Sequence, residues 1–167
     1  MVRRAVAWRM ATGAGEPDPS DIPVLLRHAR GAYGNTVATM LAGAGFEDLP
    51  RNGPFLLGGM ANHGGSAVEM IQALGVTRQA ASQLVDTLVL RGYLDRQTNP
   101  RDRRRMDIEL TERGRAAAGV VREAIKGVDR ELTAMLSPSE LDGLRAGLRA
   151  LSAIKEKAQT VRDPTPW

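Results

Sequence analysis

Residues 66–114 indicate the architecture of the chain most directly, and their sequence is SAVEMIQALGVTRQAASQLVDTLVLRGYLDRQTNPRDRRRMDIELTERG. Ser66 and Glu69 have the spacing of a capping box, in which two residues satisfy free backbone amides at a helix start. The helix that they begin is short, because Gly75 occupies the place of a left-handed residue that ends a helix. The stretch therefore opens with a brief helix.

A second helix follows closely. Thr77 has the hydroxyl of an N-cap, and we expect the helix to run to Arg91 and to end at Gly92. Two helices that are joined by about four residues including a glycine form a helix-turn-helix. The second helix is then the candidate recognition helix of a DNA-binding protein.

This second helix has two different faces. At about 100° per residue, its polar side chains fall within one arc, and they are Arg78, Gln79, Ser82, Gln83 and Asp86. The opposite arc is apolar and consists of Ala80, Ala81, Leu84, Val85 and Leu88. Arginine pairs with guanine, glutamine with adenine and serine with either base. The candidate DNA-binding residues of the helix are therefore Thr77, Arg78, Gln79, Ser82 and Gln83. The alternative interpretation is a solvated polar face, which most surface helices have.

A β-hairpin is expected after the recognition helix. Residues 93–97 can form one strand and residues 106–110 the other, in which apolar and acidic side chains alternate as in a half-buried strand. The loop between the strands contains turn-forming residues and is strongly cationic, with Arg101, Arg103, Arg104 and Arg105 against Asp102. Such a loop is often only solvated, but arginine at a hairpin tip can also enter a narrow minor groove.

The order of these elements resembles the multiple-antibiotic-resistance regulator (MarR) family of winged-helix transcription factors. The resemblance rests on Asp102-x-Arg104 and on Ile108-x-Leu110-Thr111-x-x-Gly114, and it extends over residues 21–158. It implies that Asp102 braces the wing, that Arg104 contacts DNA, and that the neighbouring wing arginines reach phosphates. It also implies a homodimer, a palindromic operator and, in many members, a small aromatic or phenolic effector.

The rest of the chain supplies helices outside this unit. We expect helices over residues 21–43, from Pro54 towards His63, from Thr111 to about 136, and after a capping box at 137–140 with a proline at its first position. The fold class is mainly α with a small β-wing, a winged helix-turn-helix flanked by N- and C-terminal dimerisation helices. The apolar faces of the flanking helices could complete the core of one domain, but a second subunit is the simpler partner.

The predicted domain organisation has three parts. Residues 1–20 form a flexible leader, residues 21–158 a single domain and residues 159–167 a tail. Within the domain the winged helix covers about 54–111, and the dimerisation helices cover about 21–44 and 112–158. Residues 63–65 could add a brief first strand to the wing sheet. A chain of 167 residues with 43% hydrophobic and 25% charged residues is typical of one globular domain.

Composition limits the function classes. A net charge of +4 and a pI near 10.1 favour polyanionic partners only weakly. The chain has no cysteine, which excludes disulfides, cysteine-bound zinc and thiol-based sensing. No nucleophile–base pair, phosphate loop or metal-ligand cluster is evident, so we predict neither an enzyme nor a cofactor or metal. No run is apolar enough to span a membrane, and we expect a cytoplasmic protein.

The resemblance also suggests an effector pocket between the dimerisation helices and the winged helix. The candidate residues at its border are Arg27, His28, Tyr33 and His63. Each histidine has a simpler interpretation, as a surface residue for His28 and as a helix-capping residue for His63. We predict a sequence-specific regulator of double-stranded DNA, a repressor that binds a palindromic operator as a homodimer. It is either released by a small-molecule ligand or has no effector and is controlled by its own concentration. The alternative is a winged-helix module for protein contacts without specific DNA binding.

Overall fold

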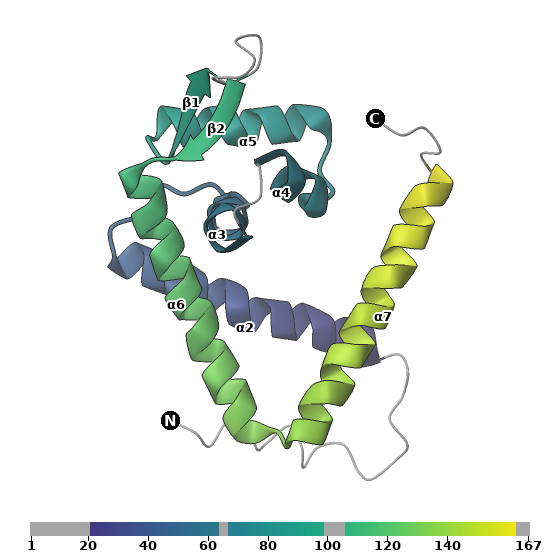
Figure 1. Cartoon of the computed structure of the whole chain (residues 1–167). Coiled ribbons are helices and arrows are strands. Elements are labelled where there is room, and N and C mark those ends of the chain that lie inside the picture. Colours follow the sequence, from purple (N-terminus) through teal and green to yellow (C-terminus); the bar gives the residue numbers. More distant parts are fainter. Residues whose placement is uncertain (1–20, 64–66, 99–105, 163–167) are drawn as a thin grey trace.

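The structure of the chain is a computed structural model that describes residues 21–63, 67–98 and 106–162. In this part of the chain six helices and two strands follow one another (Figure 1). They are α2 (Asp21–Gly43), α3 (Gly53–His63), α4 (Ala67–Leu74), α5 (Arg78–Leu90), β1 (Leu94–Thr98), β2 (Met106–Leu110), α6 (Glu112–Met135) and α7 (Pro138–Arg162). The predicted fold class is confirmed, since the protein is mainly α-helical and carries a small β-wing beside a helix-turn-helix.

The helix-turn-helix consists of α4 and α5, and the residues that bound it act as predicted. Gly75 ends α4 with a positive φ of 63°, which glycine adopts without strain. Thr77 caps α5, because its hydroxyl oxygen accepts a hydrogen bond from the amide of Ala80 at 3.2 Å. Ser66 lies outside the described residues, so the capping box predicted at the start of α4 remains a prediction.

The C-terminus of α5 explains why β1 begins one residue later than predicted. Gly92 has a φ of 71°, and its amide donates to the carbonyl of Val89, while the amide of Tyr93 donates to the carbonyl of Leu88. These two bonds form a Schellman motif, in which the chain folds back over the last turn of a helix. Tyr93 therefore belongs to the helix terminus, and the strand begins at Leu94.

The wing is an antiparallel hairpin of β1 and β2, in which Leu94 pairs with Leu110 and Thr98 pairs with Met106. The cationic tip, residues 99–105, lies outside the described part of the chain, and so do the predicted wing residues Arg101, Asp102, Arg103, Arg104 and Arg105. The described sheet has two strands. A first strand was expected at 63–65, but His63 is the last residue of α3 and residues 64 and 65 are not described.

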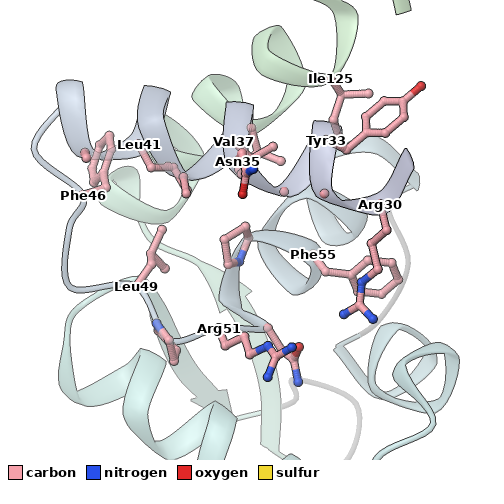
Figure 2. A pocket seen from close by; sticks show the side chains of 18 of the residues that line it. Arg30, Tyr33, Asn35, Val37, Leu41, Phe46, Leu49, Arg51, Phe55 and Ile125 are labelled. Atoms are coloured by element: carbon pink, nitrogen blue, oxygen red, sulfur yellow. The ribbon is translucent and has the colours of Figure 1, made fainter. Parts of the chain in front are cut away.

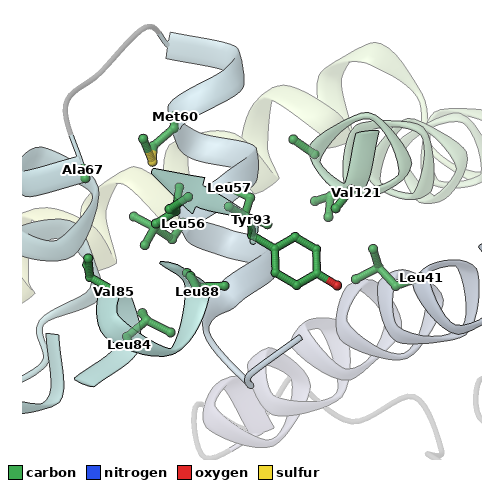
Figure 3. Close-up of a cluster of buried hydrophobic side chains, with 13 residues drawn as sticks. Leu41, Leu56, Leu57, Met60, Ala67, Leu84, Val85, Leu88, Tyr93 and Val121 are labelled. Atoms are coloured by element: carbon green, nitrogen blue, oxygen red, sulfur yellow. The ribbon is translucent and has the colours of Figure 1, made fainter. Parts of the chain in front are cut away.

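The core lies where α3, α5 and α6 meet the hairpin. Its largest fully buried side chains are Tyr93, Leu56, Leu57, Leu88 and Leu94 (Figure 3). The apolar arc of α5 supplies part of it, with Ala81, Leu84, Val85 and Leu88 all buried. Ala80 is exposed, contrary to the prediction, because it lies at the edge of this arc in the first turn of the helix. The buried face fixes the direction in which the polar face of α5 points.

The helices α2, α6 and α7 lie outside the winged helix. α2 packs across α6, while α7 diverges from α6 after the turn at residues 136–137 (Figure 1). The capping box predicted for α7 is confirmed: the Ser137 amide donates to Glu140 Oε2 at 2.8 Å, and the Glu140 amide donates to Ser137 Oγ at 3.3 Å. None of the described helices is long and apolar enough to cross a membrane.

α7 extends to Arg162, beyond the predicted beginning of the C-terminal tail at residue 159. The prediction placed this boundary too early. Residues 159–162 are Gln-Thr-Val-Arg, which contain no helix breaker, and the next proline is Pro164. Because proline disfavours helical geometry in the residue before it, the sequence first opposes the helix at Asp163.

Candidate nucleic-acid interface

The polar face of α5 is presented to solvent. Its exposed residues are Thr77, Arg78, Gln79, Ser82 and Gln83, the set that the sequence predicts to bind DNA. The opposite face is held by the core, and both ends of the helix are capped. The structure therefore brings the predicted residues together on one side of a rigid helix, which suits precise contacts better than a loop would.

An ion pair joins the hairpin to the polar face of α5. The Arg96 guanidinium on β1 forms an ion pair with the Asp86 carboxylate on α5. Both side chains are about half exposed, at 44% and 55%. The sequence placed Asp86 on the polar face of the helix and Arg96 in a strand, but it offered no signal that the two would meet.

A polar cluster ties the winged helix to the linker that follows α2. The Tyr93 hydroxyl donates a hydrogen bond to Asp48 Oδ1 at 2.5 Å, and Arg113 Nη2 lies 3.0 Å from the same oxygen. Arg113 Nη1 also donates to the carbonyl of Arg91 at 2.6 Å, and its guanidinium stacks 4.3 Å from the centre of the Tyr93 ring. One arginine on α6 therefore contacts the end of α5, the start of the wing and the linker.

The ionisation of this cluster follows from these contacts. The hydrogen bond from Tyr93, together with the charge of Arg113, lowers the pKa of the Asp48 carboxyl below its ordinary value. Burial and the hydrogen bond to Asp48 raise the pKa of Tyr93 to about 12. At neutral pH the pair is thus a phenol donor and a carboxylate acceptor, which makes the hydrogen bond charge-assisted.

Two residues of the Thr111-x-x-Gly114 motif close the base of the wing. The Thr111 hydroxyl donates to the carbonyl of Gly92 at 2.6 Å, and its oxygen caps α6 by accepting from the Gly114 amide at 3.0 Å. A Cβ atom on residue 114 would lie only 2.1 Å from the carbonyl oxygen of Tyr93. The motif thus has a structural reason, since only glycine lets α6 approach the hairpin so closely.

A cavity of about 1010 Å³ lies between α2, the linker after it, α3 and α6 (Figure 2). Of the four residues predicted to border a ligand site, Arg27 and Tyr33 line this cavity. His28 is exposed and is not one of the residues that line it, because it is turned by about 100° around α2 from Arg27. His63 ends α3, and its side chain is outside the described part of the chain.

The cavity wall combines positive charge with apolar surface. Arg27, Arg30 and Arg51 line it, with Glu47 as the single acidic residue among the described lining residues. Its apolar wall includes Val37, Leu41, Phe46, Leu49, Phe55 and Ile125. The sequence did not single out Arg30, Arg51 or the two phenylalanines. These residues come from separate elements, and only their packing shows that they share one cavity.

A hydrogen bond to α6 holds the side chain of Tyr33 in place at the cavity wall. Its hydroxyl donates to Asp129 Oδ1 on α6 at 2.6 Å, and this hydrogen bond, together with burial, raises the pKa of Tyr33 to about 12. The residue therefore joins α2 to α6 through its hydroxyl, and it is one of the residues that line the cavity. Within the described residues, no group of three acidic or histidine side chains is arranged to hold a metal ion.

Comparison with known proteins relates the central part of the chain to one family. A model of the MarR family matches residues 48–105, which include α3, the helix-turn-helix and the first strand of the wing. This central part of the chain is similar to the MarR family. A curated relative is the transcriptional repressor MprA of Escherichia coli, which is 32% identical over 90 residues, or 54% of this chain. The chain spans about half the length of the curated relatives it matches, with 51% of MprA covered.

Solved structures support the fold of this chain over most of its length. FabT of Streptococcus pneumoniae, crystallised in complex with DNA, is similar with a TM-score of 0.72 and 20% identity over 84% of this chain and 99% of FabT. PcaV of Streptomyces coelicolor, crystallised with its natural ligand, has a TM-score of 0.60 and 21% identity over 85% of this chain and 98% of PcaV. At these identities the likeness concerns the fold.

Proposed function

We propose that this protein is a transcriptional regulator of the MarR family that binds double-stranded DNA through α5 and the wing. The observation that carries the proposal is the exposed face of α5, where Arg78, Gln79, Ser82 and Gln83 lie opposite the buried face of the helix. These side chains match the donor and acceptor patterns of base edges in the major groove. The arginines at 101 and 103–105 follow on the adjoining hairpin and would contact the minor groove and phosphates.

We further propose that the regulator is a homodimer. α7 carries an exposed apolar row of Leu144, Leu148, Leu151 and Ile154, and the start of α2 exposes Ile22, Val24, Leu25 and Leu26. Contiguous apolar surface of this kind on a soluble protein marks an interaction site. A twofold interface through these helices would place two α5 helices in successive major grooves, about 34 Å apart, on a palindromic operator. A repressor results when that operator overlaps a promoter.

The cavity beside α2 supports an effector site as part of the same proposal. Three arginines against one glutamate, together with two phenylalanines and an aliphatic surface, suit a small aromatic or phenolic molecule that carries negative charge. Two thermal-unfolding titrations test this, one with benzoate and one with benzamide, which has a similar shape but no charge. We expect benzoate to raise the unfolding temperature in wild-type protein but not in the Arg51→Ala variant. Equal effects of the two compounds would contradict an anion site.

Binding to DNA is tested with the purified full-length protein and two labelled duplexes. One carries the intergenic sequence upstream of its own gene, and the other is random. We expect tighter binding to the upstream duplex, by about a thousandfold or more, as specific regulators show. Absence of binding to both duplexes, even at low salt, would refute the proposal and favour a winged helix used for protein contacts.

A further inference from the structure

A recess beside the recognition helix combines apolar and cationic side chains, and base recognition alone does not explain this combination. It has a volume of about 250 Å³ and lies where α4, α5 and the hairpin meet. Its apolar side consists of Ile71, Ala81, Val85 and Ile108. Its polar side consists of Arg78, Ser82 and Arg96, so two guanidinium groups and a hydroxyl group border one small space.

The ion pair with Asp86 holds the guanidinium group of Arg96 in place. Asp86 follows Ser82 by four residues on α5, which places the two side chains on the same face of the helix. Arg96 donates to Asp86 through Nη2, and a guanidinium has five N–H donors, so others remain for a second acceptor. An exposed ion pair adds little to stability. Its clearer consequence is to hold Arg96 at the edge of the recess.

The position of the recess indicates what would occupy it. A recognition helix fills the major groove, and its flanks then face the sugar-phosphate backbone at the groove walls. The recess lies on such a flank, between α5 and the wing. We propose that it receives one backbone phosphate of the DNA, bound by Arg96, with Asp86 as the positioning residue. This inference rests on the proposed DNA-binding function.

The other surfaces of the recess agree with this assignment. Its apolar side offers contact to the carbon atoms of a deoxyribose, while Arg78 and Ser82 border it from the helix. The DNA strand whose bases Arg78 and Ser82 contact would then also place one of its phosphates at Arg96. Pairing with Arg96 also offsets the negative charge of Asp86, which would otherwise repel the backbone from the recognition face.

The test is the salt dependence of binding by the full-length protein to the upstream and random duplexes. Each phosphate that a protein neutralises adds about 0.9 to the slope of log affinity against log salt concentration. We expect Arg96→Ala to reduce the slope by about 1 on both duplexes and to weaken both complexes to a similar degree. Arg96→Lys should keep the slope, because it keeps the charge. Arg122→Ala, which removes an exposed arginine from α6, is the matched control and should change neither quantity.

A double variant distinguishes a positioning role of Asp86 from a purely structural role of its ion pair with Arg96. In the wild type, Asp86→Asn should weaken binding because Arg96 loses its anchor. In the Arg96→Ala background the same change should strengthen binding, because an unpaired carboxylate next to the phosphates is removed. If the ion pair had only a structural role, the variants would change the unfolding temperature, but Asp86→Asn would not have opposite effects on DNA binding in the two backgrounds. Should Arg96→Ala fail to fold, Arg96→Gln provides the same comparison of slopes.

The outcomes distinguish this inference from the function on which it rests. A wild-type protein that binds neither duplex would refute the proposed function, and the phosphate site with it. A wild type that binds in a salt-dependent manner, together with an Arg96→Ala variant of unchanged slope, would overturn the phosphate site alone.

Discussion

The Tyr93 hydroxyl donates a hydrogen bond to Asp48 Oδ1 at 2.5 Å, joining the start of the wing to the linker after α2. Arg113 contacts both residues and also the carbonyl of Arg91 at the end of α5. The linker in turn forms part of the cavity wall through Phe46, Leu49 and Arg51. A change in the cavity therefore has a physical connection to the recognition helix and to the wing.

This hydrogen bond makes stability depend on pH in two windows. The pKa of Asp48 is lowered in the folded protein, so its contribution is present above the unfolded pKa and is lost as pH falls through the folded pKa. The pKa of Tyr93 is raised to about 12, so its contribution is complete below the unfolded value near 10 and is lost as pH rises towards 12.

Urea unfolding of the wild type and of Tyr93→Phe, measured from acid to alkaline pH, tests this account. We expect the wild type to have the higher free energy of unfolding at neutral pH and the difference to shrink at both extremes. A difference that stays constant between pH 10 and pH 12 would contradict the assignment of the alkaline limb to Tyr93.

Gly114 should not tolerate a side chain. In Gly114→Ala the new Cβ would meet the Tyr93 carbonyl oxygen at 2.1 Å, so α6 or the hairpin must move. We expect a loss of roughly 1–3 kcal/mol in the free energy of unfolding, typical of overpacking. Gly119→Ala is the matched control in the same helix, where a Cβ meets nothing within 4 Å. Alanine should stabilise that site by up to about 1 kcal/mol through helix propensity.

The exposed row on α7 should control the oligomeric state. We expect Leu148→Lys with Leu151→Lys to shift sedimentation from dimer towards monomer, because two charges would enter the proposed interface. Ala146→Lys with Ala153→Lys adds the same charge on the opposite side of the helix and should leave the dimer intact. Equal sedimentation of the two double variants would exclude this face as the interface.

The wing prediction concerns Arg104, which lies outside the described residues. Through the resemblance of its Asp102-x-Arg104 motif to the MarR pattern, we expect Arg104→Ala to weaken DNA binding strongly while the protein remains dimeric. A titration at moderate salt, combined with sedimentation, measures both properties. Unchanged affinity would remove Arg104 from the interface.

The sequence predicted best those features whose causes are local. Thr77, Gly92 and the box from Ser137 to Glu140 bound their helices through contacts within a few residues, and the structure confirms them. The alternation of apolar and polar residues also predicted which face of α5 is buried, except at Ala80, where a small side chain lies at the edge of the arc.

The sequence could not predict contacts between residues that are far apart along the chain. Asp48, Tyr93 and Arg113 meet only because α6 packs back against the hairpin, and no local pattern marks that meeting. The cavity gives a second case, in which Arg27 was predicted but Arg30 and Arg51 were not. His28 is the converse, since its residue type suggested a ligand site while its position on α2 turns it away.

The most direct test of the central claim is the ratio of affinities for the upstream and random duplexes after removal of the α5 polar face. The variant carries Arg78→Ala, Gln79→Ala, Ser82→Ala and Gln83→Ala, all exposed positions where alanine favours the helix. Each good base contact contributes about 1–3 kcal/mol of discrimination, so the ratio should fall from about a thousandfold towards one. Weak, salt-dependent binding to both duplexes should remain. A folded, dimeric variant that keeps the wild-type ratio would show that α5 is not the element that recognises the sequence.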